Sequence, residues 1–176
     1  AGLALNSAPS DHTVSLAVKR WGILGRGARG IPITEALAWE NCAVTQFLRR
    51  PQWIHIRENP TASWRERLFL RLPFAYRHRQ RKLLKFICET DQWRLKPGPQ
   101  REAMQREFRL YLDAVKDPEL RRKLTPDYHL GCTRVPKSDR NYYEAVQRPN
   151  VHLETQRIAR IVPHGVELAY GSIREL

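Results

Sequence analysis

Cysteine, long apolar runs and acidic residues are all scarce in this sequence of 176 residues. Three cysteines without a CxxC pair predict neither a disulfide framework nor a thiolate metal site, and they favour a reducing, cytoplasmic compartment. No apolar run approaches the roughly 20 residues that span a bilayer. The first residues lack the regions of a signal peptide, so we expect none. The six histidines have no i, i+4 pair, and we therefore expect no metal site.

Basic residues outnumber acidic ones by 31 to 18, which gives a formal charge of +13. Hydrophobic residues make up 41% of the chain, enough for a packed core despite that charge. The basic excess is concentrated in residues 49–85, where aromatic residues are interleaved with it. This segment could be a solvated helix face. It could also make the chain a non-catalytic basic helical module that binds nucleic acid or an anionic membrane surface.

The apolar pattern divides the chain into four parts. Residues 1–16 are an N-terminal linker, and 17–50 follow a strand, glycine-rich turn, helix and strand pattern. Residues 51–125 are basic and helical, and 126–176 contain short strands separated by turns. We therefore predict an α/β fold, a Rossmann-like domain in which the later strands join the first parallel sheet and the helices are inserted between them.

Three apolar sets test this division. The sheet should bury a contiguous group: Ile23, Leu24, Val44 and Phe47. In the helical part, an apolar face is expected at Leu83, Leu84 and Ile87, on a helix after Pro73. A clearer stripe at helical spacing follows at Met104, Phe108, Tyr111, Leu112 and Val115.

A GxGxxG pattern follows the first predicted strand directly and precedes the helix directly. This context is typical of dinucleotide binding, because the glycines permit a tight turn, close approach of a pyrophosphate, and close helix packing. The helix N-terminus then supplies N–H donors to the phosphates. The cofactor-binding positions that this pattern predicts are Gly25, Arg26, Gly27, Ala28 and Gly30.

The end of the second predicted strand indicates which dinucleotide binds. NAD sites carry an acidic residue about 20 residues after the glycines, where it accepts from the ribose 2′-hydroxyl. This chain has Arg49 and Arg50 there instead. Two guanidinium groups favour a 2′-phosphate, so NADP is the predicted nucleotide.

Three segments together resemble the flavin-dependent Baeyer-Villiger monooxygenases, relatives of the flavin-containing monooxygenases. Residues 16–31, LAVKRWGILGRGARGI, are similar to the family's GKRVAVIGTGATGI, and residues 44–54, VTQFLRRPQWI, to its VTVFQRTPQWI. The block from 118 to 168 is similar to the family's LTPDYPIGCKRV and following NRPNVELV motifs. The resemblance covers nearly the whole chain.

The resemblance implies roles for individual residues. Arg49 matches the arginine that holds the 2′-phosphate, and Arg50 replaces a small hydroxyl residue. Residues 131–134 match the family's Gly-Cys-Lys-Arg stretch, in which the lysine helps to bind the 2′-phosphate. Thr133 takes the place of that lysine, and Arg50 could compensate for it. Arg134 matches the catalytic arginine, which stabilises negative charge on the oxygen-transferring flavin.

The family signature FxGxxxHxxxW(P/D) is changed in this chain: its Gly, His, Trp and Asp/Pro positions correspond to Gly2, Asn6, Ser10 and Asp11. Only one GxGxxG is present, whereas the family has another for FAD. The resemblance thus implies the NADP-binding portion of a flavoprotein monooxygenase, incomplete relative to the family and not active alone. The family inserts oxygen into ketones or oxidises heteroatoms, which implies NADPH and a small organic substrate as partners.

Overall fold

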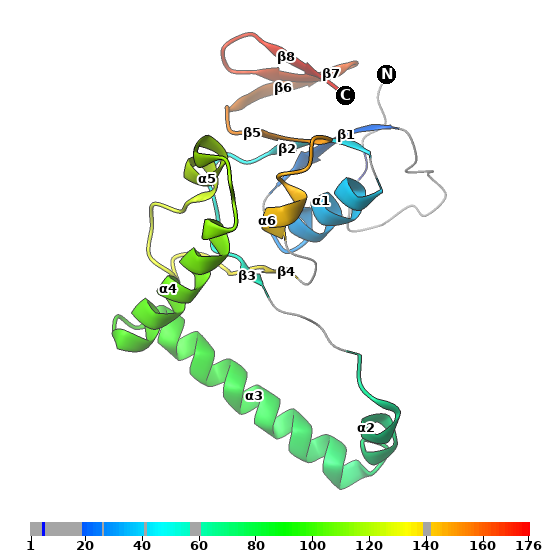
Figure 1. Ribbon diagram of the computed structural model, residues 1–176, viewed down its shortest axis with the longest axis vertical. Coiled ribbons are helices and arrows are strands. Elements are labelled where there is room, and N and C mark those ends of the chain that lie inside the picture. Colours follow the sequence, from blue (N-terminus) through cyan, green and yellow to red (C-terminus); the bar gives the residue numbers. More distant parts are fainter. Residues whose placement is uncertain (1–4, 6–18, 26, 41, 57–60, 139–141) are drawn as a thin grey trace.

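The computed structural model describes residues 5, 19–25, 27–40, 42–56, 61–138 and 142–176 (Figure 1). Arg26 and the signature-like positions Gly2, Asn6, Ser10 and Asp11 lie outside the described residues, as does nearly all of the expected linker 1–16. No helix in the described ranges combines the length and apolar character needed to cross a membrane.

A parallel sheet forms one layer of the fold. Its strands are β1 (Arg20–Leu24), β2 (Ala43–Phe47) and β5 (Val151–Glu154), in the order β1-β2-β5. Helix α1 (Gly30–Trp39) connects β1 to β2 and packs on the sheet through Leu37, which shares an apolar cluster with Ile23 and Val44. Because all three strands are parallel, their carboxyl ends lie at one edge of the sheet.

The predicted burial holds for three of the four sheet residues. Ile23, Val44 and Phe47 are buried, whereas Leu24 is 53% exposed, contrary to the prediction. Leu24 is the last residue of β1, and successive strand side chains point to opposite faces. In the described part of the chain, β1 has a neighbouring strand on one side alone, so no further strand helps to cover Leu24.

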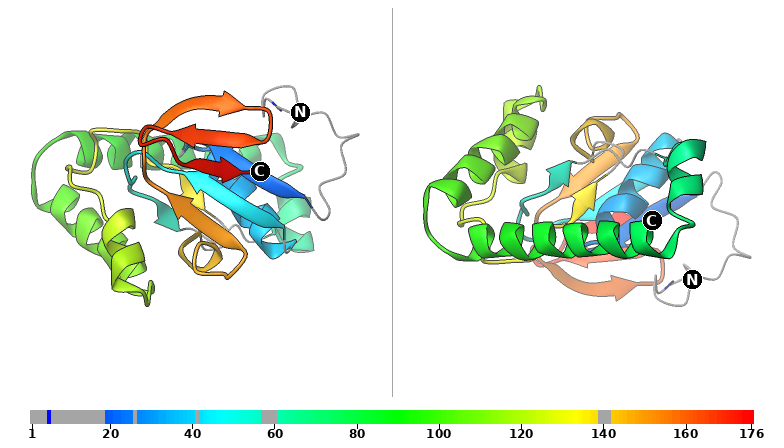
Figure 2. Two further views of the ribbon diagram at one scale, coloured as in Figure 1. Left: turned by 90° about the horizontal axis from the view of Figure 1, so that it is seen from above. Right: turned by 90° about the horizontal axis from the view of Figure 1, so that it is seen from below.

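The prediction that the later strands join the parallel sheet is correct for β5 and wrong for the rest. Strands β6 (Ile158–Val162), β7 (Gly165–Leu168) and β8 (Ile173–Glu175) form a separate antiparallel sheet (Figure 2). The reason is the length of the connections, since two residues separate β6 from β7. A parallel connection needs a crossover of about a dozen residues or more. Val166 and Leu168 pack this sheet onto Phe47.

The helical part lies between two short strands that pair with each other, β3 (His55–Ile56) and β4 (Lys137–Ser138). Its helices are α2 (Trp64–Phe69), α3 (Pro73–Leu95), α4 (Pro99–Asp113) and α5 (Pro118–Leu124). Ser63 caps α2 by accepting from the N–H of Glu66 at 3.2 Å. The short helix α6 (Tyr142–Ala145) follows β4.

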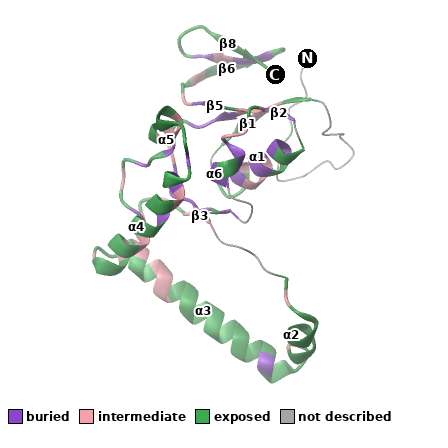
Figure 3. Ribbon diagram, in the orientation of Figure 1, coloured by how far each residue is buried: buried purple, intermediate pink, exposed green. Residues whose placement is uncertain are grey.

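The two apolar faces predicted for this part differ in outcome. On α4, Phe108 and Leu112 are buried, and Val115 is buried just beyond the helix, as predicted. Leu83, Leu84 and Ile87 on α3 are instead 40% exposed or more, so that the expected face is not packed against another described element. Figure 3 shows α3 exposed along most of its length.

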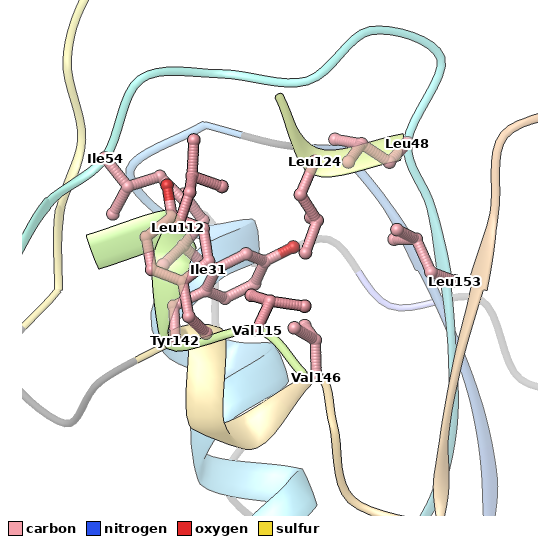
Figure 4. Packing of buried hydrophobic residues seen from close by; sticks show 10 residues of the cluster. Ile31, Leu48, Ile54, Leu112, Val115, Leu124, Tyr142, Val146 and Leu153 are labelled. Atoms are coloured by element: carbon pink, nitrogen blue, oxygen red, sulfur yellow. The ribbon is translucent and has the colours of Figure 1, made fainter. Parts of the chain in front are cut away.

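One apolar cluster joins the helical part to the sheet (Figure 4). Leu112, Val115 and Leu124 come from the helical part, while Ile31 and Leu153 come from α1 and β5. Tyr142 and Val146 pack in the same cluster. The helical part and the parallel sheet with α1 are therefore packed together through this cluster.

Candidate dinucleotide-binding site

The glycine turn leaves the carboxyl end of β1 and leads directly into α1. Gly25 has a φ of +134°, a conformation that side chains disfavour. A Cβ atom at Gly30 would lie 2.5 Å from the carbonyl oxygen of Gly25, so the first helical residue must also be glycine. Gly27 has open space where a Cβ would project. The tight turn expected at Gly25 and the close helix packing expected at Gly30 thus each have a structural cause.

In the first turn of α1, the N–H of Ile31 donates to the carbonyl oxygen of Gly27 at 3.3 Å and Pro32 has no N–H, so the donors left for a ligand are at Gly30 and in the glycine turn before it. The N-cap residue of α1, Arg29, makes no side-chain capping bond in the part of the chain that the structure describes. The first turn also has no acidic residue. Helix N-termini of this kind attract anions, because their N–H groups and the helix dipole are both directed at the approaching ligand.

An open cleft of about 800 Å³ extends from the turn along β1 and α1. Gly25, Gly27, Ala28 and Gly30 line one end of it. Trp21 and Ile33 are among the apolar residues along the rest. The predicted turn residues in the described ranges therefore line one cleft together with apolar side chains of β1 and α1.

Arg49 and Arg50 follow β2 at the same edge of the sheet. The register pairs Leu24 with Phe47, which places the start of the glycine turn and the residues after β2 at neighbouring strand ends. Both arginines are exposed. A positively charged pair thus lies at the strand next to the turn, where the sequence predicted it.

Hydrogen bonds join the segment after β2 to the segment that carries Thr133 and Arg134. The side-chain amide of Gln52 donates to the carbonyl oxygen of Arg134. The hydroxyl of Tyr128 donates to the carbonyl oxygen of Pro51 at 2.9 Å and lies 3.3 Å from the Thr133 hydroxyl. The two segments are therefore fixed side by side, although neither Thr133 nor Arg134 is hydrogen-bonded to the glycine turn within the described residues.

A buried apolar cluster supports the place where these two segments lie side by side. The indole of Trp53 is buried and donates to the carbonyl oxygen of Tyr128 at 2.8 Å. Trp53 packs with Phe108 and Leu130 in one apolar cluster. Gly131 has a φ of +103° and lies against the backbone of Arg94 at the end of α3, where a side chain would not fit. The exposed side chain of Arg134 thus extends from a rigid base.

Sequence reasoning missed a buried polar cluster beneath the turn. Gln46 of β2 donates to the carbonyl oxygen of Gly25 at 3.4 Å and accepts from the hydroxyl of Tyr142 at 2.5 Å. Burial raises the pKa values of Tyr142 and Tyr143 well above the ordinary tyrosine value. The available signal was Gln46 itself, because the similar family segment has valine at that position. Among the described residues, no group of three or more His, Cys, Asp or Glu side chains could hold a metal ion.

No protein-family model matches the chain, but individual relatives do. A monooxygenase of Mycobacterium tuberculosis is 34% identical over 176 residues, which are 99% of this chain and 35% of that protein. A Baeyer-Villiger monooxygenase of Streptomyces coelicolor is 33% identical over 162 residues, 91% of this chain and 31% of the relative. The chain thus spans about one third of the length of these curated relatives.

Solved structures share the fold. An open crystal structure of cyclohexanone monooxygenase has a TM-score of 0.77 and 22% identity, over 96% of this chain and 40% of that one. A structure of OTEMO with FAD and NADP has a TM-score of 0.72 and 23% identity, over 98% of this chain and 39% of that one. The chain is a homologue of flavoprotein monooxygenases. Within that class it belongs to the Baeyer-Villiger monooxygenase family, as the sequence resemblance predicted.

Proposed function

We propose that this chain is the NADP-binding portion of a flavin-dependent Baeyer-Villiger monooxygenase. The observation that carries the proposal is the glycine turn, whose uncapped helix N-terminus lies at the strand edge that also carries Arg49 and Arg50. Cyclohexanone monooxygenase from Rhodococcus sp. Phi1 has been solved bound to NADP+, and its fold matches this chain with a TM-score of 0.77. The similar proteins named above do not support the nucleic-acid or membrane alternative.

Different residues of the chain would bind different parts of the nucleotide. The backbone N–H groups of Gly27, Ala28 and Gly30 would hold the pyrophosphate, because these residues line the cleft and the space beside Gly27 is open. Arg49 and Arg50 would bind the 2′-phosphate through charge-assisted hydrogen bonds. Thr133 supplies no charge, so we propose that Arg50 compensates for the lysine that family members have there.

Arg134 would contribute to the oxygen-transfer step. FAD, when bound, supplies oxygen activation, and NADPH supplies the hydride that reduces it. A guanidinium remains charged throughout the physiological pH range and can stabilise an oxyanion with two parallel hydrogen bonds. The hydrogen bond from Gln52 to the backbone of Arg134 would hold this group in place. We propose a ketone or a soft heteroatom compound as the substrate class.

We further propose a domain division on the same basis. Residues 17–50 and 126–176 would be two parts of a Rossmann-like NADP-binding domain, 51–125 its helical insertion, and 1–16 a linker. The order β1-β2-β5 corresponds to one half of a dinucleotide-binding sheet, in which a further strand pairs beside the first. The apolar sequence Trp-Gly-Ile-Leu of β1 supports an interior position, because strands buried on both faces are continuously apolar.

Calorimetric titration with NADP+ and NAD+ tests the nucleotide assignment. We expect tighter binding of NADP+ by the wild type, and a loss of roughly tenfold or more for NADP+ alone in Arg49→Ala. Arg81→Ala removes an exposed arginine from α3 and should change neither affinity. Equal affinities for the two nucleotides that Arg49→Ala leaves unchanged would contradict the proposal.

A further inference from the structure

Four buried polar side chains connect α1 to the beginning of the glycine turn. Glu35 of α1, Gln46 of β2, Ser138 of β4 and Tyr142 of α6 are each 1% exposed or less. Polar groups are costly to bury unless they are hydrogen-bonded, and a connected set is more rigid than separate pairs. These four side chains therefore form a hydrogen-bonded connection next to the turn.

The direction of the hydrogen bonds near the turn follows from the partners. The carbonyl oxygen of Gly25 can only accept, so the amide nitrogen of Gln46 is the end that faces it, at 3.4 Å. The amide oxygen of Gln46 then faces Tyr142, whose hydroxyl donates to it at 2.5 Å. Because burial raises the pKa of Tyr142, this hydroxyl keeps the proton that the donation requires.

Tyr142 is held in turn by α1. The hydroxyl of Ser138 accepts from the backbone N–H of Tyr142 at 3.0 Å and donates to a carboxylate oxygen of Glu35. Glu35 lies on the helix that begins at the end of the glycine turn. The hydrogen bonds thus run from α1 through Ser138 and Tyr142 to Gln46, and return to the turn at Gly25.

We propose that Gln46 is a positioning residue, which with Tyr142 fixes the Gly25 carbonyl relative to α1 and so orients the turn's N–H groups toward a nucleotide phosphate. That the ligand is a nucleotide rests on the proposed function, whereas the role of Gln46 in fixing the geometry of the turn does not depend on it. The similar family segment has valine in place of Gln46, so a β2 strand with valine there is a reasonable packing replacement. Gln46→Val therefore removes the hydrogen bonds with little expected change in the sheet.

Hydrogen exchange without nucleotide tests the geometry. In Gln46→Val and in Tyr142→Phe, we expect the amides of Ile31 and Ile33, which donate to the carbonyl oxygens of Gly27 and Arg29, to exchange at least about fivefold faster, the factor that one lost hydrogen bond gives. Amides of the β6-β7-β8 sheet should exchange as in the wild type. Tyr143→Phe is the matched control, because Tyr143 is an equally buried neighbour outside the hydrogen-bonded set. It should leave the turn unchanged.

Nucleotide titration of the same variants gives the functional readout. Gln46→Val and Tyr142→Phe should each weaken NADP+ binding roughly fivefold, and the double variant should be no weaker than either single one, since both remove the same connection. Uniformly faster exchange across the chain, or unchanged exchange at the Ile31 and Ile33 amides, would overturn the inference. If the wild type binds no nucleotide, the proposed function is wrong, and the exchange comparison still decides whether Gln46 positions the turn.

Discussion

Gly30 packs against the carbonyl oxygen of Gly25, with room for a hydrogen atom and none for a methyl group. A Cβ at position 30 would lie 2.5 Å from that oxygen, whereas a Cβ at Gly27 would have no neighbour within 4 Å. The contact joins the end of β1 to the start of α1. Of these two glycines, the fold therefore requires Gly30, whereas Gly27 leaves space for a ligand.

Alanine substitutions should separate these two glycines. Gly30→Ala should lower the free energy of unfolding by roughly 1–3 kcal/mol, because the backbone must move to accept the methyl group. Gly27→Ala should change it by less than about 0.5 kcal/mol and yet weaken NADP+ binding, since its methyl group would occupy phosphate space. Denaturant unfolding and calorimetry measure the two effects. A Gly27→Ala variant with wild-type affinity would contradict this role.

Restoring a cation at position 133 should strengthen NADP+ binding. Thr133 is half-buried beside Tyr128, in the segment that is hydrogen-bonded to the residues after Arg50. We expect Thr133→Lys to tighten NADP+ binding several-fold, as one added charge-assisted contact to phosphate would do, without affecting NAD+. Cys132→Lys places the same charge on the exposed neighbouring residue. Equal gains in both variants, or a gain for NAD+ as well, would show a general charge effect.

The two apolar helix faces predict opposite responses to truncation. Phe108→Ala on α4 should lower the free energy of unfolding by about 3–5 kcal/mol, because a buried ring that packs with Trp53 and Leu130 is lost. Leu84→Ala on α3 should change it by less than about 0.5 kcal/mol, since Leu84 is 63% exposed. Denaturant unfolding of both variants decides this. A large loss in Leu84→Ala would mean that α3 is covered in solution.

Glu154 should make the stability depend on pH. Burial by itself would raise its pKa, but the N–H of Gln156, the guanidinium of Arg174 at 2.8 Å and His152 outweigh burial, so the pKa lies below its ordinary value. A carboxyl group with a lowered pKa stabilises the fold above its unfolded value of about 4.3, and this contribution is lost as the pH falls through the folded value. Acid should therefore weaken the packing of β8 near β5.

Glu154→Gln measures this contribution. At pH 7 we expect the variant to be less stable by roughly 1–2 kcal/mol, and the difference should shrink as the pH falls below about 4. Glu167→Gln is the control, because its partner Arg160 is largely exposed and surface pairs contribute about 0–1 kcal/mol. Thermal unfolding between pH 3 and pH 7 gives both values. A pH-independent difference for Glu154→Gln would contradict the electrostatic account.

Local patterns predicted the elements well where neighbours along the chain determine burial. The helical spacing of Phe108 and Leu112, and the strand that carries Ile23, needed only nearby residues. Leu24 was predicted to be buried and is exposed, and the predicted apolar face at Leu84 is exposed too, because burial at both places depends on which element lies beside β1 or α3. A sequence pattern reports that a face is apolar and does not report what covers it.

Some residues of the candidate site could likewise be predicted from the sequence, and others could not. The glycines of the turn could be found because their spacing follows from backbone geometry, and Arg49 because it follows a strand. Gln46 and Tyr142 could not, since 96 positions separate the two ends of their hydrogen bond. Side chains that meet through the fold leave no periodic signal in the sequence.

A crystal structure of this chain with NADP+ would decide whether the glycine turn and the two arginines hold the nucleotide. We expect the pyrophosphate at the N–H groups of Gly27–Gly30 and the 2′-phosphate within hydrogen-bonding distance of the Arg49 or Arg50 guanidinium. A nucleotide bound away from the α1 N-terminus, or a 2′-phosphate contacted by neither arginine, would contradict this expectation.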